Sequence, residues 1–249
     1  MPRARAKARG GERGKLRFTP RLAVVVTIVI LVAVNVVDVR VPHAALVVGP
    51  SVAALLLWLA RLAGLSWAEL GLGPGTWRGG LRWAGAEIGV VAVVIAAGAA
   101  LPLTRAAFRD SRYHLDLPQA LLTAFVLIPL GTVLLEEVAF RGVLWGLLRR
   151  LRGTVTATAV SSALFGVWHV LPSLGLAASN EAIGGAVGRG RSAQEIAVLG
   201  TVLFTAASGV VFCELRRRSG SLLAPAALHW ATNGLSVLAS AAVWAWASR

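Results

Sequence analysis

The sequence contains a single cysteine and few charged residues. Because Cys213 is its only thiol, an internal disulfide and a zinc site built from several cysteines are both excluded. Charged residues make up 14% of the 249 positions, against about 25% in typical soluble domains. Hydrophobic residues make up 57%, and the mean hydropathy is +0.73. This composition predicts an all-α, polytopic membrane protein.

Acidic residues are scarce, since 11 of them stand against 25 basic residues. Many of the basic residues precede the first apolar run: Arg3, Arg5, Lys7, Arg9, Arg13, Lys15, Arg17 and Arg21. A tail of this kind is typical of positive-inside topology or of contact with anionic lipid. Specific nucleic-acid binding would also call for aromatic side chains that stack on bases. We therefore interpret residues 1–21 as a basic cytoplasmic tail and expect no nucleic-acid partner.

The apolar runs predict a transmembrane helical bundle of about seven spans, with six to eight possible. No small-residue cleavage site follows the first run, so we interpret it as a retained anchor rather than a signal peptide. We expect loops at 61–80, 104–116 and 172–191. Pro118 suits the first position of the fourth helix. The predicted spans are 22–37, 44–60, 81–103, 119–150, 154–170, 195–215 and 221–246.

The distribution of basic residues predicts a cytoplasmic amino terminus. Seven spans would then place four basic clusters on one side of the membrane, as the positive-inside rule expects: the tail and residues 61–82, 149–152 and 216–218. Arg105, Arg109 and Arg112 do not follow this pattern. The Arg-rich composition is typical of a high-GC bacterium, so we expect the bacterial plasma membrane.

Two adjacent acids, Glu136 and Glu137, interrupt the fourth apolar run, and Arg141 follows them. An ionised carboxylate in hydrocarbon is costly unless it is paired or faces water, so an acidic pair within a span predicts a functional site. Glu137 and Arg141 are four residues apart, so they share a helix face and can neutralise each other. Glu136 is rotated by about 100° from Glu137. We expect Glu136 to be free to face a cavity and to act as a base.

Three further polar residues lie within predicted spans: His169, His229 and Asn233. Glu136 and His169 are each about 16 residues from a turn near Gly153, roughly 24 Å along a helix, so antiparallel helices would hold them at the same depth. His229 and Asn233 are four apart and share a face. A lone histidine or asparagine in a span more often makes a structural helix–helix hydrogen bond. Taken together, these positions predict one polar pocket among three helices.

Two kinds of hydrolytic chemistry suit this pocket. Glu136, His169 and His229 could bind Zn²⁺ and leave a position for water. Alternatively, Glu136 and His169 could activate water without a metal, while His229 and Asn233 donate to an oxyanion. The His-Glu-x-x-His signature is absent, so a metal site would have to be assembled across helices. Asparagine is a poor zinc ligand. No further acid lies near either histidine in sequence to act as the usual partner of a metal-bound histidine. Both points slightly favour the mechanism in which Glu136 holds the water that cuts the bond.

The motifs Glu136-Glu137-x-x-x-Arg141, Phe165-x-x-x-His169 and His229-x-x-x-Asn233 resemble those of the CPBP family of intramembrane proteases. This family covers type II CAAX prenyl endopeptidases and the bacteriocin-processing and immunity proteins, also called Abi proteins. The resemblance covers residues 136–233 and implies a catalytic transmembrane core at 119–246, preceded by amino-terminal helices at 22–118. It implies a catalytic set of Glu136, His169, His229 and Asn233, which Glu137 and Arg141 support.

The resemblance also implies an intramembrane endopeptidase that acts on a membrane-anchored peptide or protein. The family is often called metalloprotease, although a metal-free, glutamate-activated water has also been proposed for it. The main alternative is a non-proteolytic membrane protein, such as a proton-coupled transporter or an immunity or scaffold protein. Inverted repeats and paired broken helices, which favour a transporter, are not visible in the sequence. The three intact motifs make a scaffold the less favoured interpretation.

Overall fold

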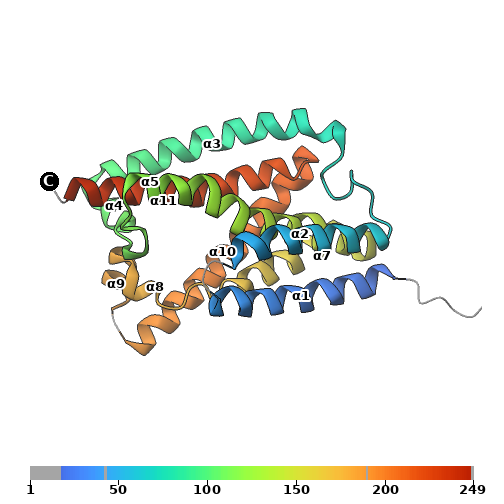
Figure 1. The fold of residues 1–249 in the computed structure, drawn as a ribbon, viewed down its shortest axis with the longest axis horizontal. Coiled ribbons are helices and arrows are strands. Elements are labelled where there is room, and N and C mark those ends of the chain that lie inside the picture. The colour runs from blue at the N-terminus through green and yellow to red at the C-terminus, as the bar shows by residue number, and fades with distance from the viewer. Residues whose placement is uncertain (1–17, 42–43, 189, 248–249) are drawn as a thin grey trace, which may run out of the picture.

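The computed structural model describes residues 18–41, 44–188 and 190–247 (Figure 1). The described residues form helices and turns, with one isolated β-bridge between Asp110 and Asn180 and no strand. The predicted all-α bundle is therefore confirmed. Residues 1–17 of the expected basic tail lie outside the described residues. The first helix already begins at Pro20, within the segment assigned to the tail.

Long apolar helices make up most of the bundle. Five described segments are long and apolar enough to cross a membrane, which supports the predicted membrane protein. The predicted last span is also a single helix, but it is not one of these five, so the count of seven spans stays a prediction. The separate long helices are α1 (Pro20–Arg40), α2 (Ala45–Leu62), α3 (Trp77–Ala100), α10 (Arg191–Ser219) and α11 (Leu223–Ala247).

Local sequence signals account for several helix ends. The Thr19 side chain accepts a hydrogen bond from the Leu22 backbone N–H at the start of α1. Asp116 caps α5 (Leu117–Leu122) in the same way, and Pro118 occupies its first turn, as the sequence indicated. Helix α3 ends at Ala100, two residues before Pro102, because a residue that precedes proline disfavours the helical conformation.

The predicted fourth helix, at 119–150, is not a regular α-helix. Pro129 lacks a backbone N–H and its ring clashes with the carbonyl four residues earlier, so the helix around it cannot keep the usual i→i−4 bonds. Wider π-helical turns appear on both sides of it. Such turns are rare and often occur at functional sites. The order is α5, η4 (Thr123–Leu127), η5 (Pro129–Val133), α6 (Leu134–Glu136), η6 (Glu137–Leu144) and α7 (Trp145–Trp168).

The segment Leu117–Trp168 folds back on itself at Gly153. Its 52 residues would extend for about 78 Å as one helix, more than twice the hydrocarbon thickness of a bilayer. Gly153 has a φ of 82°, which glycine adopts without strain, and this breaks the helix. Beyond it, the Ser161 hydroxyl donates to the Phe140 carbonyl over 2.8 Å, and the Trp168 indole donates to Glu136 over 2.9 Å. The predicted antiparallel hairpin is confirmed.

Glycines allow α10 to pack closely against α7. A Cβ on Gly166 would lie 2.7 Å from the Val202 carbonyl oxygen, and one on Gly209 would lie 3.0 Å from Ser162 Cα. A larger residue at either position would push the two helices apart. Helix α10 therefore supports the end of α7 that leads to His169. Figure 1 shows the remaining arrangement, with α3 running alongside α11 on the outside of the bundle.

Two segments expected to be loops contain short helices. The segment 172–191 forms α8 (Leu176–Ser179) and α9 (Glu181–Val187). The segment after α3 forms α4 (Pro102–Arg105), η2 (Ala106–Phe108) and η3 (Ser111–Tyr113), while η1 (Pro74–Thr76) precedes α3. The expectation of plain loops was wrong because the two segments stabilise each other. The Asn180 amide donates to the Ala107 carbonyl, and Arg109 pairs with Glu181 over 3.2 Å.

Candidate active site

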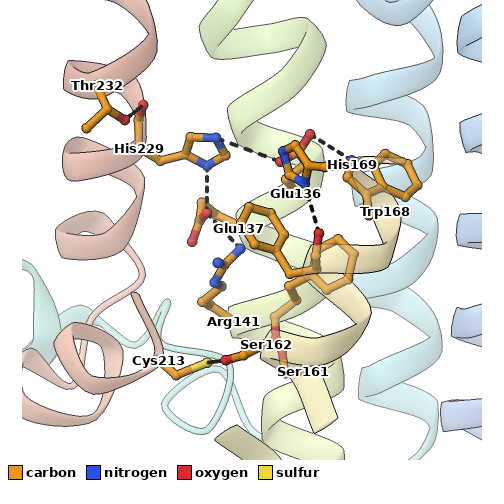
Figure 2. Close-up of polar contacts among 12 residues, drawn as sticks. Glu136, Glu137, Arg141, Ser161, Ser162, Trp168, His169, Cys213, His229 and Thr232 are labelled. Carbon is orange, nitrogen blue, oxygen red and sulfur yellow. Dashed lines mark hydrogen bonds and ion pairs between the residues drawn. The ribbon is translucent and has the colours of Figure 1, made fainter. Parts of the chain in front are cut away.

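A buried charge network lies where η6, α7 and α11 meet (Figure 2). Glu137 and Arg141 are 1% and 0% exposed, and the guanidinium Nη1 lies 3.1 Å from the Glu137 Oε1. The predicted ion pair is therefore present. The guanidinium carbon also lies 3.8 Å from the centre of the Phe165 ring and 4.6 Å from that of Phe212. Aromatic faces attract a cation, so the two rings add to the environment that holds Arg141.

His229 lies between the two acidic side chains. Its Nδ1 is 2.8 Å from Glu137 Oε1, and its Nε2 is 3.7 Å from Glu136 Oε2 (Figure 2). An ionised carboxylate can only accept, so Nδ1 carries the proton and donates it to Glu137. The ring also stacks on Phe212, with centroids 5.3 Å apart. Glu137 is therefore the acidic partner of His229 that sequence reasoning missed, because the pair is 92 residues apart.

Glu136 has one bonded oxygen and one free oxygen. Its side chain is buried, and Oε1 accepts the hydrogen bond from the Trp168 indole. Oε2 is buried and has no hydrogen-bond partner among the described residues. Glu136 also lines the main cavity of the bundle. The prediction that Glu137 is paired while Glu136 faces a cavity is confirmed. The role of Trp168 was missed, since an aromatic residue at the end of a span is common and not diagnostic.

His169 caps the end of α7. It follows the last helical residue, Trp168, and its Nδ1 lies 2.8 Å from the Phe165 carbonyl oxygen. The final carbonyls of a helix have no partner within the helix, and this imidazole satisfies one of them. A carbonyl oxygen only accepts, so Nδ1 is the donor and Nε2 is available for a ligand or for a proton. The 165–169 spacing thus fixes the orientation of the ring.

The cavity beside Glu136 has a volume of about 980 Å³. Glu136, His169 and Asn233 line it from three different helical segments. His229, Glu137 and Arg141 are not among the lining residues, although His229 Nε2 lies 3.7 Å from Glu136 Oε2. The Asn233 amide makes no hydrogen bond within the part of the chain that the structure describes, so it is available to a bound group. The predicted convergence of three helices on one pocket is thus confirmed for Glu136, His169 and Asn233, but His229 is not among the lining residues. Helix α10 also contributes lining residues: Ile196, Ala197, Gly200, Thr201, Phe204 and Thr205.

Helix α1 also contributes to the cavity, through Asn35 and Asp38. The Asn35 amide donates to the Trp168 carbonyl over 2.9 Å. Sequence reasoning assigned no role to Asp38, which follows the predicted first span at 22–37. The sequence did contain a signal for this contribution, since the two polar residues are three positions apart and therefore share one face of an apolar helix.

Arg112 lines the cavity as well, and its guanidinium pairs with Asp110 over 2.7 Å. Burial alone would raise the pKa of the Asp110 carboxyl, but the hydrogen bonds and charge of Arg112 lower it below the ordinary value. Asp110 is therefore ionised at neutral pH. Among the described residues, the Arg112 guanidinium forms an ion pair with Asp110 and with neither Glu136 nor Asp38.

Zinc binding by Glu136, His169 and His229 stays a prediction. Within residues 18–41, 44–188 and 190–247, no three His, Cys, Asp or Glu side chains are grouped closely enough to hold a metal ion. His229 Nδ1 is occupied by Glu137, and His169 Nδ1 by a backbone carbonyl. In each histidine, therefore, only Nε2 is available as a metal ligand.

A family comparison matches the same part of the chain. Residues 118–235 match the family described as type II CAAX prenyl endopeptidase Rce1-like. No curated protein and no solved structure matches the chain. The matched segment begins in α5 and ends in α11, so it contains all six predicted site residues, while α1, α2 and α3 lie outside it. Residues 118–235, a little under half of the chain, thus match an Rce1-like domain, in agreement with the family that the three sequence motifs resemble.

Proposed function

We propose that this protein is an intramembrane endopeptidase in which water held at Glu136 hydrolyses a peptide bond of a membrane-anchored peptide or protein. One observation carries the proposal. Glu136 Oε2 is buried, lacks a hydrogen-bond donor, and belongs to a side chain on the wall of a cavity that also contains His169 and Asn233. A carboxylate in that state is costly for folding alone. It is well placed to accept a proton from water.

The proposed reaction starts with attack of the water oxygen on the carbonyl carbon, while Glu136 Oε2 accepts the water proton. His169 Nε2 helps to orient the water. Glu136 then passes the proton to the amide nitrogen, and the C–N bond breaks. The Asn233 amide and, in its imidazolium form, His229 Nε2 donate to the oxyanion that forms on the carbonyl oxygen. Fixed donors of this kind stabilise charge as it develops in the transition state.

Glu137 and Arg141 support the reaction without touching the substrate in this proposal. Glu137 holds the proton of His229 on Nδ1, so Nε2 is the nitrogen that faces Glu136. Arg141 in turn fixes the Glu137 carboxylate. A buried carboxylate that orients an imidazole serves the same purpose in serine-protease triads.

The direct test is cleavage of a membrane-peptide library by purified protein in liposomes. Wild-type protein should release fragments that mass spectrometry can assign to single cleaved bonds. Glu136→Ala, prepared in parallel, should release none of them. Cleavage of the same bonds at equal rates by the variant would show that a contaminating protease, and not this cavity, performs the hydrolysis.

We propose that turnover does not require a bound metal. The support is the geometry of Glu136, His169 and His229, which are not grouped as metal ligands. Chelators should then leave turnover unchanged, and elemental analysis of active protein should find less than one metal ion per chain. The zinc alternative makes the opposite prediction. One tightly held zinc per chain, lost together with activity in His229→Ala and restored by added zinc, would establish it.

We also propose that the protein lies in a bacterial plasma membrane with its amino terminus in the cytoplasm. The basic clusters support this orientation. Residues 216–218 form one such cluster at the end of α10, so a cysteine introduced at Arg217 should react with a membrane-impermeant reagent only in inverted vesicles. Reaction in intact cells would reverse the proposed topology.

A further inference from the structure

Asp38 is an acid in the cavity that lies outside the family-matched segment. It is in the last turn of α1, lines the same cavity as Glu136, and interacts electrostatically with that carboxylate. The Asp38 Oδ1 is buried and has no hydrogen-bond partner among the described residues, as is also true of Glu136 Oε2. Two acidic groups thus face one space, each with an oxygen that has no donor.

No arginine or lysine among the described residues that line the cavity forms an ion pair with either acid. Arg112 is the only basic side chain other than histidine in that lining, and Asp110 holds it. Arg141 is not among the lining residues and pairs with Glu137. Asp38 is not needed to fasten α1, because Asn35 already donates to the Trp168 carbonyl. A carboxylate oxygen that is buried without a hydrogen-bond donor opposes folding, and two such oxygens on residues of one cavity favour a ligand that brings positive charge.

We propose that Asp38 binds the primary ammonium group that hydrolysis releases, which makes it a second acidic contact for the substrate. This inference rests on the proposed function. Hydrolysis converts an amide and water into a carboxylic acid and an amine, and the proton lost by the acid gives an ammonium ion and a carboxylate. Glu136 ends the reaction in its starting state. Asp38 attracts the ammonium product, while both acids repel the carboxylate product and favour its departure.

The test measures ammonium binding separately from hydrolysis. Purified full-length protein in nanodiscs is titrated with octylammonium and, as a neutral probe of equal chain length, with octan-1-ol, and binding is followed by the shift in thermal unfolding. Asp38→Asn should bind octylammonium about 10- to 100-fold more weakly, as expected for loss of one charge-assisted hydrogen bond. The octan-1-ol titration should not change. Asp38→Glu, which keeps the charge, should retain the preference for octylammonium.

Glu87→Gln is the matched control. Glu87 is on α3, both of its carboxylate oxygens are buried without a hydrogen-bond partner among the described residues, and it does not line the cavity. This variant should bind octylammonium as the wild type does. Asp38→Ser provides a second neutral variant should Asp38→Asn fail to fold.

The outcomes separate this inference from the proposed function. Equal octylammonium affinity in the wild type and in the neutral Asp38 variants would overturn the inference, whether or not the protein cleaves peptides. Asp38-dependent binding in a protein that cleaves no peptide would support the ammonium site while the proposed hydrolysis fails. Loss of octylammonium binding in Glu87→Gln to the same extent as in Asp38→Asn would also overturn the inference, because the effect would then be nonspecific.

Discussion

Replacing Glu136 with glutamine is expected to lower turnover by about 100- to 10,000-fold, the range for loss of a general base. The change is nearly isosteric. The glutamine Oε1 can still accept the hydrogen bond from the Trp168 indole, so the contact between α6 and α7 is kept. The amide cannot accept a proton from water, because it has no basic oxygen. Initial rates on a confirmed substrate, measured beside a thermal unfolding curve, test both halves of this expectation.

The unfolding temperature of Glu136→Gln should be at or above the wild-type value, since the change removes a buried charge whose Oε2 has no hydrogen-bond donor among the described residues. Glu87→Gln makes the same chemical change elsewhere in the membrane region and should leave the rate unaltered. Full turnover in Glu136→Gln would mean that another group activates the water. His169, the other base on the cavity wall, would then be the first candidate.

Short-range spacing predicted much of the candidate site. The Glu137–Arg141 pair follows from a separation of four residues, and the common depth of Glu136 and the end of α7 follows from their equal distances to the turn at Gly153. These inferences succeeded because they depend on helix geometry alone. That geometry is the same wherever the helix packs.

Long-range contacts could not be predicted in the same way. Whether Glu137 meets His229, or Asp38 faces Glu136, depends on how α11 and α1 are rotated and placed against the hairpin. Packing among many apolar side chains decides that rotation, and the spans are too uniformly apolar to show a buried face in sequence. The π-helical turns around Pro129 were missed for a related reason. Secondary structure is predicted from the periodic spacing of apolar residues, and these uniformly apolar turns show no such spacing.

Replacing Arg141 with alanine is expected to destabilise the fold by about 3 to 5 kcal/mol, the usual cost of removing one partner from a buried ion pair. Glu137 would keep only His229 as a hydrogen-bond partner while 1% exposed. The guanidinium also fills the space over the Phe165 and Phe212 rings, so alanine would leave a void there. Thermal or denaturant unfolding in detergent, together with the yield of folded protein, measures the loss.

A double substitution separates the unpaired charge from the lost volume. Arg141 Nε and Nη2 are buried without hydrogen-bond partners among the described residues, so the native pair is itself incompletely satisfied. Arg141→Met with Glu137→Gln removes both charges and keeps most of the side-chain volume, and should therefore recover much of the stability lost in Arg141→Ala. Turnover should stay low, because glutamine orients His229 less firmly than a carboxylate does. If instead the double variant is as unstable as Arg141→Ala, the contribution of Arg141 lies in its contacts with the rings and not in pairing with Glu137.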